Sequence, residues 1–118
     1  LDVGLSAWPP APDWDVLVNA TPVGTWPYAT DLPVPGDLVR GRIVYDLVYN
    51  PAETALLRVA RSHGAQTIGG LEMLIGQARA QFEWWTGQRP DTQVMREVIT
   101  VRTPAATRAL STPSGPAE

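Results

Sequence analysis

Three short apolar runs alternate with helical patterns along this chain, and that alternation limits the fold more than any other feature. The runs lie within residues 14–20, 42–48 and 65–68, and a helical pattern follows the second and the third of them. Strands that alternate with helices indicate a parallel α/β sheet joined by right-handed crossovers. The sequence therefore predicts an α/β fold. Three strands form only part of an open sheet of this kind, so one face and one edge are expected to be open.

Capping and turn residues set the boundaries of the predicted helices. Asn50 is expected to cap the first helix, and Pro51 fits its first position, where no donor is missed. Gly64 and Gly87 are expected to end the first and second helices. The helices are therefore predicted over residues 50–63, 71–86 and 91–101. The apolar stripe of the second helix, which should face the core, consists of Leu71, Leu74, Ile75, Ala78, Phe82 and Trp85.

Two segments lack a helical or strand pattern. Residues 21–42 are rich in Pro and Gly and are too long for a simple turn, so we expect them to wrap a ligand site or cover a sheet edge. Residues 104–118 are small, polar and rich in Pro, which predicts a disordered tail after a domain over residues 1–103.

Within that domain, the continuous apolar run from Val16 to Val18 is typical of a parallel strand covered on both faces.

The composition excludes several kinds of chemistry. The chain has no Cys and no Lys, and its only His is His63. It therefore supplies no thiolate, no lysine acid/base and no His-rich metal site, so no metal is expected. A net charge of -3 and Arg residues spread along the chain disfavour nucleic-acid binding. Because no apolar run is long enough to span a membrane and no signal peptide opens the chain, we expect no membrane contact and a cytoplasmic location.

Polar residues and a glycine follow the strands at the rim where parallel sheets bind ligands. The residues at this rim are Asn19 and Thr21 after the first strand, Leu47 and Tyr49 after the second, and Gly70 after the third. We expect them to converge, because the carboxyl ends of parallel strands share one edge. Taken from the residues alone, Asn19 and Thr21 more commonly bond nearby backbone than a ligand.

The block Gly70-Leu-Glu-Met-Leu-Ile-Gly-Gln77 opens the long helix, and Gln77 lies two turns along the same face as Gly70. Spacing alone is also compatible with a turn glycine and a surface glutamine. Met73 in this block is compatible with a contact to a ligand, but a Met at this spacing more often packs in the core. Asp46, at the end of the second strand, is predicted to be a structural acceptor for loop N–H groups.

Three blocks in this order, Asp15–Pro22, Val44–Pro51 and Gly70–Gln77, resemble the C-terminal part of the NADP-binding domain of the shikimate dehydrogenase family. The resemblance covers about residues 13–90 and places the C-terminal region of the family at about residues 66–98. It implies the C-terminal half of a Rossmann-like parallel sheet with flanking helices. It also implies NADP as cofactor, shikimate or 3-dehydroshikimate as substrate, and reversible hydride transfer between the nicotinamide C4 and a secondary alcohol carbon.

The resemblance further implies a role for each matched residue. Cofactor-binding residues would be Leu47, Gly70, Asn19 and Thr21, and substrate-binding residues would be Tyr49 and Gln77. The family's catalytic Lys and Asp have no counterpart here, so no catalytic residue is expected and the chain alone should be inactive. The alternatives are an NAD-using quinate or shikimate paralogue, and a non-catalytic interaction module. A homodimer through the open sheet edge also stays an alternative.

Overall fold

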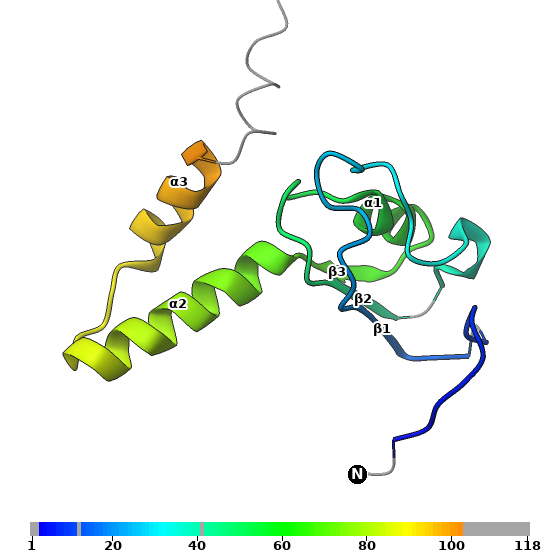
Figure 1. Cartoon of the computed structure of the whole chain (residues 1–118), viewed down its shortest axis with the longest axis horizontal. Coiled ribbons are helices and arrows are strands. Elements are labelled where there is room, and N and C mark those ends of the chain that lie inside the picture. Colours follow the sequence, from blue (N-terminus) through cyan, green and yellow to red (C-terminus); the bar gives the residue numbers. More distant parts are fainter. Residues whose placement is uncertain (1–2, 12, 41, 103–118) are drawn as a thin grey trace, which may run out of the picture.

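A parallel sheet lies at the centre of the fold, in a computed structural model that describes residues 3–11, 13–40 and 42–102 (Figure 1). The strands follow the order β1-β2-β3 and all run parallel, which confirms the α/β prediction. The strands are β1 (Val16–Asn19), β2 (Ile43–Asp46) and β3 (Gln66–Ile68). The helices are α1 (Ala55–Ser62), α2 (Gly70–Thr86), α3 (Thr92–Arg102) and the short 3-10 helix η1 (Gly36–Leu38).

One face of the sheet packs against α1 and the loop between β1 and β2. Side chains alternate between the two faces along each strand, so Leu17 and its β2 partner Val44 share the inner face. Val44 is fully buried, and Leu17 packs against the same core. The buried core consists of Val34, Val39, Val44, Leu56, Leu57, Ala60 and Ala65. Burial of these apolar side chains is the main favourable term that holds α1 on the sheet.

The other face of the sheet is open. Val18 pairs with Tyr45, and Tyr45 pairs with Ile68, which places all three on this face. Val16 is 50% exposed, Val18 49% and Ile68 41%. The prediction that β1 is covered on both faces is therefore wrong for this chain. The expectation that a half sheet leaves a face open is confirmed.

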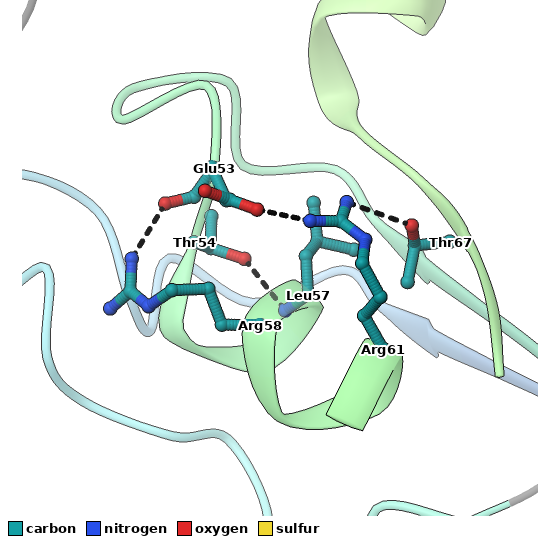
Figure 2. A network of polar contacts seen from close by, with 6 residues as sticks. All are labelled: Glu53, Thr54, Leu57, Arg58, Arg61 and Thr67. Atoms are coloured by element: carbon teal, nitrogen blue, oxygen red, sulfur yellow. Dashed lines mark hydrogen bonds and ion pairs between the residues drawn. The ribbon is translucent and has the colours of Figure 1, made fainter. Parts of the chain in front are cut away.

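The cap of α1 differs from the prediction. Thr54, not Asn50, is the N-cap, because its Oγ1 accepts a hydrogen bond from the backbone N of Leu57 at 3.3 Å (Figure 2). Thr54 is fully buried, and its hydroxyl also donates to Asp46 Oδ2. A Thr oxygen that is already held in place makes a better cap than an Asn four residues earlier. The helix consequently starts at Ala55.

An arginine on α1 joins the start of the helix to the sheet. Arg61 forms an ion pair with Glu53 and donates a hydrogen bond to Thr67 Oγ1 on β3 at 3.2 Å (Figure 2). Arg58 donates to the carbonyl oxygen of Glu53 at 3.1 Å. These side chains are exposed, so they orient the helix more than they stabilise it. The predicted end of α1 is confirmed within one residue, with His63 as its C-cap and Gly64 at a positive φ of 82°.

The long helix α2 leaves the sheet after its first turns (Figure 1). Its start at Gly70 and its end at the left-handed Gly87 agree with the predicted boundaries. The predicted core stripe is only partly correct. Ile75 is buried, whereas Phe82 is 38% exposed and Trp85 74%. Only the N-terminal part of α2 reaches the sheet, so the residues further along have no core to face.

The loop between β1 and β2 contributes to both the core and the rim. Val39, near η1, is fully buried, and its carbonyl oxygen lies 2.6 Å from Nδ1 of His63.

Among the described helices, none combines the length and the apolar character that crossing a bilayer requires. The predicted disordered tail at residues 104–118 lies outside the described residues.

Candidate functional site

A hollow of about 490 Å³, called the rim hollow here, opens at the carboxyl ends of β1 and β2. Its walls come from two segments, one after each strand. The lining residues are Ala20, Thr21, Pro22, Thr25, Leu47, Val48, Tyr49 and Asn50. Of the predicted site residues, Thr21, Leu47 and Tyr49 are therefore brought together. The lining residues in the described part of the chain do not include Asn19, Gly70 or Gln77.

Asn19 lies directly behind the rim hollow and is only 3% exposed. Its Nδ2 donates to Val23 O at 3.2 Å and to Asp46 Oδ1 at 2.9 Å. Its Oδ1 accepts from the backbone N of Thr21 at 3.1 Å and from Thr21 Oγ1 at 2.7 Å. An Asn side chain has two donor hydrogens and two acceptor lone pairs. The contacts within the chain therefore occupy its whole hydrogen-bonding capacity.

Asp46 is fully buried and holds three donors from three segments. Its Oδ1 accepts from Asn19 Nδ2 and from the backbone N of Val48 at 3.0 Å. Its Oδ2 accepts from Thr54 Oγ1 at 2.6 Å. The prediction that Asp46 is a structural acceptor is confirmed. Sequence reasoning did not find its partners Asn19 and Thr54, because neither spacing nor residue type links them to Asp46.

The hydroxyl of Thr21 has one position left for a ligand. Its proton goes to Asn19 Oδ1, and its oxygen accepts from the backbone N of Val23 at 3.3 Å. A hydroxyl has two acceptor lone pairs, so one of them remains free. Thr21 is exposed at the hollow. It can therefore accept a hydrogen bond from a bound ligand but has no proton to donate.

Position 70 requires a glycine because the start of α2 lies close to the backbone of Leu47 and Val48. A Cβ on Gly70 would lie 2.2 Å from Leu47 O and 2.7 Å from Val48 O. Real Cβ atoms do not come this close to carbonyl oxygens, so only glycine allows the start of α2 to contact this wall of the rim hollow. Its predicted contact with the cofactor stays a prediction, and the glycine already has a structural reason.

Tyr49 and Gln77 carry free polar groups. The side chain of Tyr49 is about half exposed at the rim hollow, and Gln77 lies exposed on α2. Among the described residues, neither the Tyr49 hydroxyl nor the Gln77 amide has a hydrogen-bond partner. Both groups are therefore available to a ligand, as the substrate-binding prediction requires.

Asn50 lines the rim hollow, whereas the sequence analysis expected it only to cap a helix. Its Oδ1 is buried without a hydrogen-bond partner in the described part of the chain. Its carbonyl oxygen accepts from the backbone N of Trp26 at 2.9 Å, which ties the loop after β1 to this wall. A polar side chain beside Pro at the end of a strand was the available signal, but it also indicated a helix cap.

A neighbouring hollow of about 350 Å³ shares Pro22 and Thr25 with the rim hollow. Trp26, Tyr28 and Asp31 line it further along the loop. The described residues contain no group of His, Cys, Asp and Glu side chains that could hold a metal ion. The polar chemistry of the site therefore comes from hydroxyl, amide and backbone groups.

Glu72, in the first turn of α2, pairs with Arg96 on α3. Both terminal nitrogens of Arg96 contact the carboxylate, with 3.0 Å between Nη2 and Oε2. The hydrogen bond from Arg96 lowers the pKa of Glu72, desolvation opposes it, and the positive charge of Arg96 adds to the lowering. The same pair raises the pKa of Arg96, mainly through that hydrogen bond.

We expect Arg96→Met to bring the pKa of Glu72 back up towards its ordinary value of 4.5. A carboxyl group with a lowered pKa in the folded chain stabilises the fold above its unfolded pKa, and this contribution is lost as the pH falls through the lowered value. An NMR titration of the Glu72 carboxyl carbon measures the midpoint. Arg58→Met, which removes an arginine elsewhere, is the control. The same Glu72 midpoint in Arg96→Met and in the unsubstituted chain would contradict the pairing.

The three-stranded parallel sheet, the hollow at its carboxyl rim and the helix that starts there define the C-terminal half of a Rossmann-like dinucleotide-binding domain. The profile of the Shikimate 5'-dehydrogenase C-terminal domain matches residues 70–100. The chain is 46% identical over 97 residues to shikimate dehydrogenase (NADP(+)) of Archaeoglobus fulgidus, which covers 81% of this chain and 34% of that protein.

Solved structures give the same result. Shikimate 5-dehydrogenase of Thermus thermophilus in complex with NADP(H) and shikimate is 39% identical, with a TM-score of 0.63 over 80% of this chain and 34% of that one. Quinate dehydrogenase of Corynebacterium glutamicum in complex with NAD is 37% identical, with a TM-score of 0.69 over 76% and 32%. The resemblance to the shikimate dehydrogenase family is thereby confirmed, and this chain spans about a third of the length of its relatives.

Proposed function

We propose that a protein carrying this chain is a shikimate dehydrogenase. It reduces 3-dehydroshikimate reversibly to shikimate with NADPH, a step of the shikimate pathway. The observation that carries the proposal is the rim hollow, where Thr21, Leu47 and Tyr49 meet at the edge at which parallel sheets bind ligands. The similarity to shikimate dehydrogenases over most of the chain supports the same substrate and cofactor. A cytosolic location belongs to this proposal.

The described residues fit a nicotinamide cofactor and a hydroxylated substrate. Thr21 offers one acceptor position, and Leu47 offers an apolar surface beside it. Tyr49 and Gln77 offer polar groups that no described residue occupies. NADPH would supply the hydride, and these side chains would bind and orient the reactants. The general acid must come from outside this chain if it is a lysine, since the sequence has none.

The direct test is NADPH consumption by the full-length protein with 3-dehydroshikimate. The expected result is turnover with this pair and none with the isolated 118-residue chain. NAD⁺ with quinate, followed as NADH formation while quinate is oxidised, serves as the second arm, because the similarity to an NAD-bound quinate dehydrogenase favours that alternative. Faster turnover in the second arm would replace the proposal by the quinate reading, and turnover in neither arm would reject both.

Gln77→Ala in the full-length enzyme is expected to raise the KM for shikimate. Removal of a buried hydrogen bond to the substrate costs on the order of 1–3 kcal/mol, which corresponds to roughly a five- to 150-fold loss of affinity. Steady-state kinetics measures it. Gln88→Ala removes an exposed amide after the end of α2 and is the matched control. If Gln77→Ala leaves both KM and kcat unchanged, Gln77 is a surface residue.

A non-catalytic interaction module is the second candidate, and one observation favours it. The open face of the sheet carries exposed Val16, Val18 and Ile68, and such a surface associates readily. A homodimer of the isolated chain would use this surface. Sedimentation equilibrium of the isolated chain, with and without NADP⁺, separates the two candidates. Tight dimers without cofactor binding would favour the module.

A further inference from the structure

We infer that Asn19 is a positioning residue, which orients Thr21 and joins the two walls of the rim hollow without touching the cofactor. This inference rests on the proposed function only where the cofactor is named. It departs from the cofactor-binding role that the family resemblance implies for Asn19. The Asn19 side chain is buried, and groups of the chain itself already occupy all its hydrogen-bonding positions.

The Asn19 amide has no hydrogen-bonding capacity left for a ligand. Both hydrogens of its Nδ2 and both lone pairs of its Oδ1 have partners in the chain, namely Val23, Asp46 and two groups of Thr21. A cofactor atom could bond to Asn19 only by displacing one of these partners. Asn19 is also buried, with only 3% of the residue exposed. A direct contact would therefore leave a buried group unpaired, which is costly.

Asn19 and Asp46 connect the two walls of the rim hollow. The backbone oxygen of Asn19 accepts from Leu47 N at 3.0 Å, and Asp46 Oδ1 bonds both Asn19 Nδ2 and Val48 N. The wall after β1 and the wall after β2 thus meet at one buried cluster. A shift of the Asn19 side chain would move both walls, because buried hydrogen-bond networks act as a unit.

Asn19 also sets the direction of the Thr21 hydroxyl. Thr21 Oγ1 donates its only proton to Asn19 Oδ1 and accepts from Val23 N, and these two bonds fix the direction of its remaining lone pair. Without Asn19 only the N–H of Val23 would hold the hydroxyl, so the O–H bond would be free to rotate and the remaining lone pair would lose its fixed direction. Asn19 therefore acts on a ligand through Thr21, and the two residues should behave as one unit.

A double-mutant cycle in the full-length protein tests this coupling, with NADP⁺ affinity measured by fluorescence titration. Thr21→Val and Asn19→Ala are each expected to weaken binding by about tenfold, and the double variant by no more than the larger single loss. Gln88→Ala should leave the affinity unchanged. Multiplied losses of about a hundredfold in the double variant would mean that Asn19 contacts the cofactor itself, which would overturn the inference. Unchanged affinity in Asn19→Ala, with a loss in Thr21→Val, would overturn it as well.

Amide exchange in the ligand-free protein gives a readout that needs no cofactor. Asn19→Ala should speed exchange of the Thr21 amide by about tenfold, because that N–H loses its acceptor. Unchanged exchange would overturn the inference. If Asn19→Ala does not fold, NOEs from the Asn19 Nδ2 protons in the unsubstituted protein decide. Contacts to bound NADP⁺ overturn the inference, and contacts confined to the chain support it. Failure to turn over 3-dehydroshikimate would reject the proposed function alone.

Discussion

Asp46→Ala is expected to lower the free energy of unfolding by about 3–5 kcal/mol, the largest effect of any single substitution in the rim cluster. The substitution leaves Asn19 Nδ2, Val48 N and Thr54 Oγ1 without their acceptor. All three groups lie in a region that water does not reach, so each unsatisfied donor adds its own desolvation cost. Thr54 would also lose the contact that holds it at the cap of α1.

Urea unfolding of the protein followed by circular dichroism measures the change. Asp13→Ala is the matched control, because Asp13 is exposed and should change stability by less than about 0.5 kcal/mol. Asp46→Asn should lower the free energy of unfolding by less than Asp46→Ala and by more than Asp13→Ala, since the one oxygen of the new amide still accepts from some of the donors. A loss below about 1 kcal/mol in Asp46→Ala would show that water replaces the carboxylate, contrary to its burial.

Gly70→Ala is expected to destabilise the fold by about 3 kcal/mol or to displace the start of α2 from β2. The added methyl group would lie 2.2 Å from Leu47 O and 2.5 Å from Leu47 C. These are backbone atoms, so the collision cannot be relieved by a change of rotamer. Thermal unfolding gives the stability, and the environment of Leu47 can be followed by NMR.

Gly76→Ala is the matched control for Gly70→Ala, because both glycines lie in α2. A Cβ at Gly76 meets nothing within 4 Å. The same substitution should therefore stabilise α2 by roughly 0.5–1 kcal/mol through the better helix propensity of Ala. Equal effects at the two positions would contradict the close approach. In the full-length enzyme, a Gly70→Ala variant that keeps its stability but loses NADP⁺ affinity would assign the glycine to the cofactor instead.

The element order and most helix ends could be predicted from the sequence because their causes are local. An apolar run between turn residues is enough to place a strand, and a left-handed glycine such as Gly87 is enough to end a helix. The cap of α1 could not be predicted in this way. Asn50 and Thr54 are both good capping residues, and the contact between Thr54 and Asp46 decides between them.

Burial was harder to predict than secondary structure. Phe82 and Trp85 have the spacing of a core stripe, yet α2 extends beyond the sheet and leaves them exposed (Figure 1). Val16 and Val18 have the character of a doubly covered strand, yet no described element covers their face. Periodicity shows which residues share a face, but it does not show whether another element lies over that face.

The sequence by itself determined the parallel α/β order, the rim at which Thr21, Leu47 and Tyr49 meet, and the family resemblance, because each rests on short local patterns and on the rule that parallel strands end at one edge. Only the tertiary structure decided what Asn19 and Gly70 do. Asn19 meets Asp46, which lies 27 residues further along the chain, and Gly70 meets Leu47 through backbone atoms. Hydrogen-bond saturation and steric contact depend on distances between segments, and a linear pattern does not contain those distances.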